Sequence, residues 1–275
     1  MKKVVLSVLA ALAVSTAAPA FAADMPVKAS KMVAPVVVSP FDIAFGVAFT
    51  SDYVLRGISQ SNRKPAVQGY FEGRYNINDM IQLYAGIWGS SVASYNASAE
   101  IDPSAGVRFT FGNFGLDLGY VYYYYPDGTS GTNAYGSFGE FYVKPTYKFN
   151  DWLSIGGVID GGSNFNNGYL IAGSKTAYFY AGNATITLPW QFNGVTIAIN
   201  PEIGRQVYEC TGCNSYTWWD VGLVFNYKAV TLDLRYWDTG RHGVFVAPAA
   251  FGGKDLGGST FVATLKFDAT LSALK

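Results

Sequence analysis

The chain has 275 residues, and its 19 lysines and arginines balance 19 aspartates and glutamates. This balance excludes a strongly basic nucleic-acid binder, and the aromatic content of 16% excludes a largely disordered chain. No apolar run of about 18 residues follows the N-terminal segment, which excludes a helical membrane protein. A charge-poor chain that is rich in Gly and aromatic residues suits an all-β protein facing lipid.

Residues 1–22 have the pattern of a secretory signal peptide. Two lysines precede a short apolar run, and Ala20-Phe21-Ala22 forms a small-x-small cleavage site. Residues 23–40 are rich in Pro and Ala, and we expect them to form a periplasmic tether because Pro blocks regular strand pairing. The chain is therefore expected to leave the cytoplasm.

From Phe41 onward, apolar side chains recur at every second position. In the first such stretch, Phe41, Ile43 and Phe45 alternate with Asp42 and Ala44. Successive side chains of a strand point to opposite faces, so one face is apolar and the other is small or polar. We predict twelve strands, at residues 41–52, 66–77, 80–91, 100–111, 114–125, 138–149, 152–161, 176–188, 194–206, 216–227, 229–238 and 259–270.

The links between these strands alternate in length. Short links such as Asn78-Asp79 and Gly112-Asn113 alternate with longer links, most of them rich in Gly, Ser and Asn. This alternation is typical of a transmembrane antiparallel up-and-down β-barrel, with short periplasmic turns and long extracellular loops. A water-soluble antiparallel sandwich would also alternate. Charges on the polar faces and the export signal favour an outer-membrane barrel in residues 41–270.

Aromatic residues near the strand ends predict two belts at the membrane interfaces. We place Trp218, Trp219, Tyr236 and Trp237 in the belt beside the long loops. The amphipathic rings of Trp and Tyr favour the headgroup level, so a paired distribution indicates a membrane rather than a protein core.

The inward face of the barrel is the expected functional surface. Its charges would either tune which solutes pass through a hydrated lumen or pair across strands and fill the lumen. Eight strands give a filled interior and sixteen give an aqueous channel, so twelve strands leave both alternatives open. The pore-lining candidates are Glu72, Arg74, Arg108, Asp117, Glu140, Lys144, Lys148, Asp160, Glu202, Asp220, Asp233, Arg235, Lys266 and Asp268.

Three residues in the long links bear on catalysis and metal binding. Cys210 and Cys213 form a Cys-Thr-Gly-Cys motif in an exported chain, where a disulfide is expected and no nearby His completes a metal site. His242 is the single histidine, and no Gly-x-Ser-x-Gly elbow accompanies it, which disfavours a lipolytic enzyme. We expect no enzymatic activity, no metal and no cofactor.

The segment from Ser51 to Gly69, SDYVLRGISQSNRKPAVQG, resembles the signature of the TorF family of proposed porins, a bacterial outer-membrane family. The resemblance implies an outer-membrane β-barrel with a porin role and no established substrate. The charged residues of this loop signature are Asp52, Arg56, Arg63 and Lys64. We hypothesise that this first long loop folds onto the barrel mouth, where Asp52 and Arg56 hold it by hydrogen bonds.

Together these features predict a porin-like channel for passive diffusion of small hydrophilic solutes across the outer membrane of a Gram-negative bacterium. The alternative is a closed barrel that has a structural role or acts through surface interactions of its extracellular loops. The expected partners are outer-membrane lipid and lipopolysaccharide, the solutes, and the barrel-assembly machinery during insertion. Nucleic acid is not an expected partner.

Overall fold

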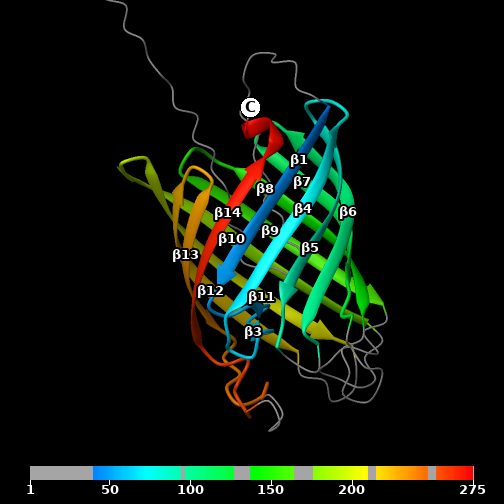
Figure 1. Ribbon diagram of the computed structural model, residues 1–275, viewed down its shortest axis with the longest axis vertical. Helices are drawn as coiled ribbons and strands as arrows, with labels where there is room; N and C mark the ends of the chain where they lie inside the picture. Colours follow the sequence, from blue (N-terminus) through cyan, green and yellow to red (C-terminus); the bar gives the residue numbers. More distant parts are fainter. Residues whose placement is uncertain are drawn as a thin grey trace, which may run out of the picture.

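The computed structural model describes residues 40–93, 97–126, 137–163, 176–209, 215–246 and 252–274. These residues form a closed antiparallel barrel of twelve strands (Figure 1), so the predicted fold class is confirmed. The expected signal peptide, nearly all of the expected tether and the two cysteines Cys210 and Cys213 lie outside the described residues.

The strands of the wall follow one another around the barrel in chain order. They are β1 (Phe41–Thr50), β4 (Ala66–Asn76), β5 (Ile81–Ser91), β6 (Ala99–Phe111), β7 (Phe114–Tyr123), β8 (Phe138–Lys148), β9 (Leu153–Ser163), β10 (Thr176–Phe192), β11 (Val195–Tyr208), β12 (Tyr216–Tyr227), β13 (Val230–Asp238) and β14 (Thr260–Thr270). β1 pairs with both β4 and β14. This closure leaves no strand edge unpaired in a solvent without water.

Two short strands and one short helix complete the described elements. β2 (Val54–Leu55) and β3 (Ile58–Ser59) form a separate hairpin in the link after β1, and a 3-10 helix (Leu271–Leu274) follows β14. Within the described ranges, no helix is long and apolar enough to cross a membrane.

The largest difference from the predicted strand bounds lies at the end of β10. The sequence predicts that β10 ends at residue 188, but the strand continues to Phe192, and its pairing with β11 shifts register between Thr187 and Gln191. Pro189 lies in this irregular stretch. Proline has no backbone N–H to donate, and a bulge accommodates it without ending the strand. The turn is therefore Asn193-Gly194, both with positive φ, as a two-residue hairpin turn requires.

The apolar face of the strands points away from the barrel axis. Phe141 is 72% exposed, whereas the adjacent Glu140 is 0% exposed. Ile159 and Phe261 are also exposed on this outer surface. The distribution is the inverse of a water-soluble protein, and it places the apolar side chains where a bilayer would solvate them.

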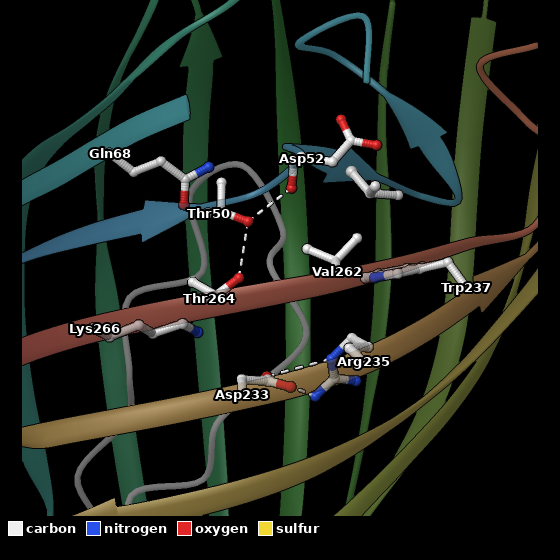
Figure 2. Close-up of a pocket in the computed structure, with 10 residues that line it drawn as sticks. Thr50, Asp52, Gln68, Asp233, Arg235, Trp237, Val262, Thr264 and Lys266 are labelled. Carbon is white, nitrogen blue, oxygen red and sulfur yellow. Dashed lines mark hydrogen bonds and ion pairs between the residues drawn. The ribbon is translucent and has the colours of Figure 1, made fainter. Parts of the chain in front are cut away.

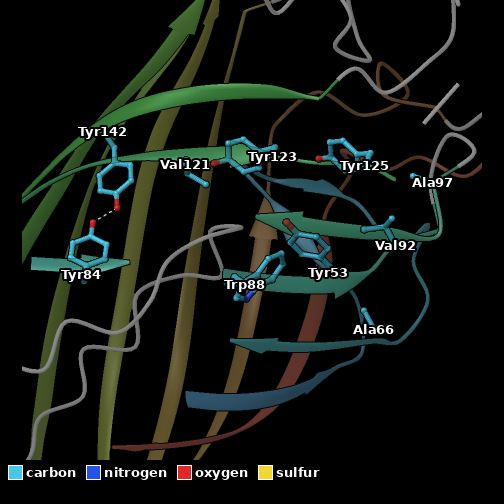
Figure 3. Close-up of a cluster of buried hydrophobic side chains, with 10 residues drawn as sticks. All are labelled: Tyr53, Ala66, Tyr84, Trp88, Val92, Ala97, Val121, Tyr123, Tyr125 and Tyr142. Carbon is cyan, nitrogen blue, oxygen red and sulfur yellow. Dashed lines mark hydrogen bonds between the residues drawn. The ribbon is translucent and has the colours of Figure 1, made fainter. Parts of the chain in front are cut away.

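The inner face combines glycines with large aromatic rings. A side chain at Gly106 or Gly119 would collide with the hydroxyl ends of Tyr84 and Tyr142. Glycines therefore allow these two rings to lie close to the wall strands, where their hydroxyls meet (Figure 3). The remaining space in the lumen is available to a loop.

The assignment of Trp218 and Trp237 to a lipid-facing belt is wrong. Both side chains are buried inside the barrel, with exposed fractions of 0% and 2%. Their sequence neighbours Trp219 and Tyr236 point outward and pack on each other with ring centroids 5.5 Å apart. Adjacent residues of a strand face opposite sides, so only one member of each aromatic pair can reach lipid.

Candidate functional site in the barrel lumen

Residues 51–65, which we call the inner loop, join β1 to β4 at the lower end of the barrel in Figure 1, and most of their side chains are buried. Their hairpin pairs Leu55 with Ile58, which leaves Arg56 and Gly57 as a two-residue turn at its tip. These residues have φ values of 50° and 79°, as a type I′ turn requires. Arg56 is an unusual residue at such a position, and strain of this kind persists where surrounding contacts hold the backbone.

The Arg56 guanidinium contacts four strands of the opposite wall. It forms a bidentate pair with Glu140 of β8, with Nη2 2.6 Å from Oε2 and Nη1 3.2 Å from Oε1. Nη1 also donates to Oε1 of Gln206 on β11 at 3.0 Å. Asp160 of β9 lies 3.8 Å from Nη2, and Cζ lies 3.6 Å from the ring centroid of Phe179 on β10. The tip of the inner loop therefore spans the lumen from wall to wall.

The surroundings of Arg56 keep it charged although it is buried. Burial by itself lowers the pKa of the guanidinium, but nearby Glu140, Tyr123 and Asp160 raise it, and the net effect is a pKa well above the ordinary value. Bidentate pairing to a carboxylate and stacking on an aromatic ring are the contacts that guanidinium groups favour. The site therefore pairs with both terminal nitrogens of the guanidinium, while the buried Nε has no hydrogen-bond partner among the described residues.

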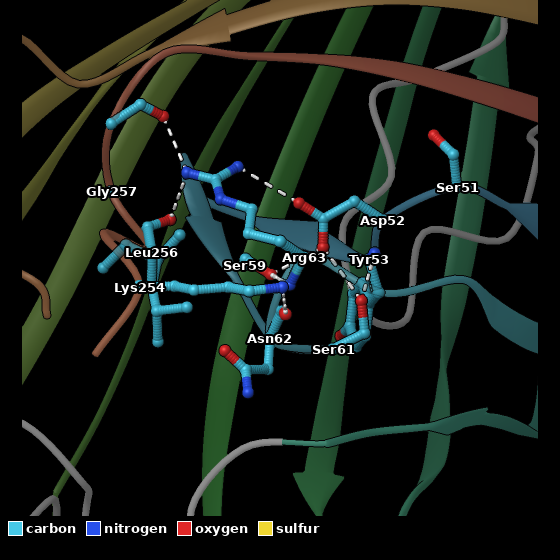
Figure 4. A network of polar contacts seen from close by, with 12 residues as sticks. Ser51, Asp52, Tyr53, Ser59, Ser61, Asn62, Arg63, Lys254, Leu256 and Gly257 are labelled. Atoms are coloured by element: carbon cyan, nitrogen blue, oxygen red, sulfur yellow. Dashed lines mark hydrogen bonds and ion pairs between the residues drawn. The ribbon is translucent and has the colours of Figure 1, made fainter. Parts of the chain in front are cut away.

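A second arginine, Arg63, fastens the inner loop to the link between β13 and β14 (Figure 4). Its Nε donates to the backbone carbonyl of Asp255 at 3.1 Å. Its Nη2 donates to the carbonyls of Leu256 and Gly258 at 2.9 and 2.7 Å. The backbone N–H of Ser59 adds a bond to the Leu256 carbonyl at 2.9 Å. Two long links are therefore joined at the same end of the barrel.

Asp52 organises the base of the inner loop. Its Oδ1 accepts hydrogen bonds from the hydroxyls of Ser59 and Ser61 at 2.5 and 2.9 Å, and its Oδ2 pairs with Arg63 at 3.1 Å. Burial raises the pKa of the Asp52 carboxyl above its ordinary value, and these hydrogen bonds and the Arg63 charge offset only part of the increase. Lys64 is exposed, and its backbone N–H bonds the Ser61 carbonyl at 3.1 Å.

A second buried guanidinium cluster, which we call the wall cluster, is built from wall strands alone. Arg108 of β6 pairs with both oxygens of Glu72 on β4, each at 2.8 Å, and with Asp117 of β7 at 3.1 Å. Its Cζ lies 3.8 Å from the ring centroid of Tyr84 on β5. Glu72 also binds Arg74 on its own strand. The wall cluster links neighbouring strands and takes no residue from the inner loop.

A third arginine cluster, centred on Arg235, lies beside a small cavity next to the inner loop (Figure 2). Arg235 pairs with Asp220 and, at 3.0 Å, with Asp233. The cavity volume is about 10 Å³, which is room for about one water molecule. Its lining includes Asp52, Gln68, Asp233, Arg235, Thr264 and Lys266. This cavity is therefore too small for a solute larger than water.

The structure places most pore-lining candidates on inward-facing positions, but their role in transport stays a prediction. Four inward-facing candidates lie outside the clusters around Arg56, Arg108 and Arg235. They are Lys144, Glu202, Lys266 and Asp268. Lys148 differs, because it lies at a short turn and pairs with the exposed Asp151 at 2.8 Å. Charge alone did not identify Phe179 and Gln206 as partners of Arg56. Their inward position in the strand alternation was the available signal.

His242 lies in the link between β13 and β14. Its Nε2 lies 3.5 Å from Oδ1 of Asp238, and the side chain is exposed. Within the described ranges, no group of three or more His, Cys, Asp or Glu side chains is arranged to hold a metal ion.

Fold and site together define the class: a transmembrane β-barrel of the outer-membrane type whose lumen is occupied by one of its own loops. Residues 35–268 match Gcw_chp, a family of bacterial proteins of unknown function, and the chain belongs to this family. The match establishes a bacterial family, and the TorF name stays an interpretation of the loop signature.

Solved structures resemble the chain in fold. A structure from a study of in-meso crystallization of membrane proteins has a TM-score of 0.50 and 12% identity, covering 84% of this chain and 84% of that chain. The NanC porin has a TM-score of 0.46 and 12% identity, covering 83% and 98%. A Pseudomonas aeruginosa FadL homologue has a TM-score of 0.44 and 9% identity, covering 85% and 90%. No curated protein matches the chain. At these identities the likeness concerns the fold alone.

Proposed function

We propose that this protein is a channel for passive diffusion of small hydrophilic solutes across the bacterial outer membrane, and that its inner loop closes the lumen in the conformation described. The observation that carries the proposal is that a loop, rather than a wall strand, fills the lumen. β2 and β3 form their own two-stranded sheet, separate from the barrel. The inner loop can therefore move without breaking any pairing of the wall.

The lining supports hydrophilic solutes. Charges of both signs face inward, and the apolar residues face outward. Such a lining would favour water and polar solutes once the inner loop is displaced, and it would exclude apolar molecules. The TorF-like loop signature implies the same role. We also propose that the chain is not an enzyme, and a hydrolytic activity that disappears in His242→Ala would contradict this.

A specific observation favours the alternative of a permanently closed barrel. The wall cluster and the paired hydroxyls of Tyr84 and Tyr142 occupy the lumen independently of the inner loop. If these side chains alone prevent the passage of solutes, removal of the inner loop will leave the barrel closed. The protein would then have a structural or surface-interaction role.

Conductance in planar bilayers separates the two proposals. The full chain is compared with a variant in which residues 53–63 are replaced by a short Gly-Ser linker. The channel proposal expects rare openings for the native protein and sustained stepwise currents for the variant. Arg205→Ala is the matched control, because Arg205 is exposed on the outer face, where its side chain donates to the hydroxyl of Thr217. A variant that shows folded, heat-modifiable mobility on gels and yet stays silent would establish the closed barrel instead.

A further inference from the structure

The groups that hold Arg56 form a site that is complete without the inner loop. Glu140, Asp160, Phe179 and Gln206 belong to the four successive strands β8 to β11. They supply a bidentate carboxylate, a second carboxylate, an aromatic face and an amide oxygen. Their backbone positions are fixed by barrel pairing, so the site persists when Arg56 leaves.

The buried carboxyl groups of this site favour a cation. Glu140 is 0% exposed and Asp160 is 4% exposed, and Oδ1 of Asp160 is buried without a hydrogen-bond partner among the described residues. Glu100 and Asp102 of β6 are also buried. Buried carboxylates without a counter-charge are costly, so the vacated site would attract a positive group strongly.

We propose that this wall site binds the guanidinium group of a small organic cation, and that Arg56 is a built-in ligand that occupies the site when no such solute is present. A guanidinium fits better than an ammonium, because its planar fork matches both oxygens of Glu140 while its face stacks on Phe179. An arriving cation competes with Arg56, displaces the tip of the inner loop and opens the lumen. The opening step rests on the proposed channel function, whereas binding does not.

The binding test uses Arg56→Asn in the full chain. Asn tolerates positive φ, so the turn is retained while the guanidinium is removed. The probe is millimolar methylguanidinium chloride, and the controls are urea, its neutral planar counterpart, and KCl at equal ionic strength. The readout is the temperature at which the folded, heat-modifiable band is lost. Methylguanidinium should raise this temperature for Arg56→Asn, and neither control should do so.

Two further proteins make the binding result specific. Adding Glu140→Gln to Arg56→Asn should abolish the methylguanidinium effect, because the bidentate partner is lost. The native protein should need a concentration about tenfold higher or more, since Arg56 must first be displaced from the site. Equal responses of Arg56→Asn with and without Glu140→Gln, or no response in either, would overturn the proposal.

Conductance measurements then separate the site from the channel. In a KCl gradient, Arg56→Asn should pass cations in preference to anions, added methylguanidinium should reduce the current, and Glu140→Gln should weaken both effects. Methylguanidinium binding without current in any variant would support the wall site and contradict the channel. Current without methylguanidinium binding would support the channel and contradict the wall site.

Discussion

Two arginines inside this barrel have almost the same chemical surroundings but opposite structural roles. Arg56 and Arg108 each pair both terminal nitrogens with one glutamate, approach a nearby aspartate and stack on an aromatic ring. Arg108 comes from a wall strand, whereas Arg56 comes from a loop with no ladder to the wall. The same contacts therefore strengthen the wall in one case and hold a movable segment in the other.

The difference shows that the origin of a side chain in the fold determines what its ion pair does. Breaking the wall cluster leaves buried charges that the wall strands cannot move into water. Breaking the Arg56 contacts lets the inner loop leave the lumen, and water can then solvate the charges that remain. The first change should affect stability, and the second should affect conductance.

The largest expected effect is on the wall cluster. Glu72→Ala removes the carboxylate that pairs with both Arg108 and Arg74. Arg74 then loses its carboxylate partner, whereas Arg108 keeps Asp117. Removing one partner of a buried ion pair costs about 3–5 kcal/mol. We expect the midpoint temperature of the heat-modifiable transition to fall markedly, without sustained currents from molecules that remain folded. A Glu72→Ala protein with native thermal stability would show that water already reaches this cluster.

The second effect concerns conductance. Arg56→Asn keeps the turn but removes the charge-assisted bonds to Glu140, worth about 1.5–3 kcal/mol, so the open probability should rise roughly tenfold to a hundredfold. The thermal midpoint should change much less than in Glu72→Ala, because no contact between wall strands is lost and water can solvate Glu140 once the inner loop leaves. If Arg56→Asn lowers stability as much as Glu72→Ala and opens no channel, the inner loop is a fixed part of the barrel and the comparison fails.

The barrel could be predicted because its pattern is local. Each strand repeats an apolar position every two residues, and lipid imposes the same preference all around the wall. The outcome for Trp218 and Trp237 shows the limit of counting aromatic residues near strand ends. Their alternation relative to Trp219 and Tyr236 contained the correct answer, since neighbours in a strand cannot share a face.

The interior of the site could not be predicted in the same way. Arg56 and Glu140 are separated by 84 positions in the sequence. No local sequence pattern predicts that their side chains form an ion pair. The sequence identified Arg56 as a residue of the first long loop and Glu140 as inward-facing, but not that the loop enters the lumen. That placement depends on the space left by inner glycines such as Gly119 and Gly204, over which Tyr142 and Trp218 lie.

A third prediction concerns Gly57→Ala, a substitution that disturbs the inner loop without changing its charge. Gly57 has a φ of 79°, and an added Cβ would lie 2.6 Å from Cγ2 of Thr239 and 2.8 Å from Cβ of Trp218. Gly57→Ala therefore combines backbone strain with a collision, at a cost of about 1–3 kcal/mol. We expect more frequent openings while Arg56 retains its affinity for the wall.

The matched control for this substitution is Gly240→Ala. Gly240 also has a positive φ, 62°, but an added Cβ would meet nothing within 4 Å. It should therefore change conductance less than Gly57→Ala. Equal effects of the two substitutions would mean that backbone strain alone, rather than the contact of Gly57 with the wall, governs closure.

The smallest expected effect is the pH dependence of closure through Asp52. Burial raises the pKa of this carboxyl in the attached inner loop, while a displaced loop would return it to its ordinary value. Below the ordinary pKa both states are protonated, so attachment is most favourable there. As the pH rises from the ordinary pKa to the raised pKa, Asp52 is already ionised in the displaced loop but still protonated in the attached loop. Attachment therefore weakens over this range of pH. Open probability should increase with pH in this window, and Asp52→Asn should flatten the increase, with Asp151→Asn at an exposed turn as control. A slope that survives in Asp52→Asn would assign the titration to a different carboxyl.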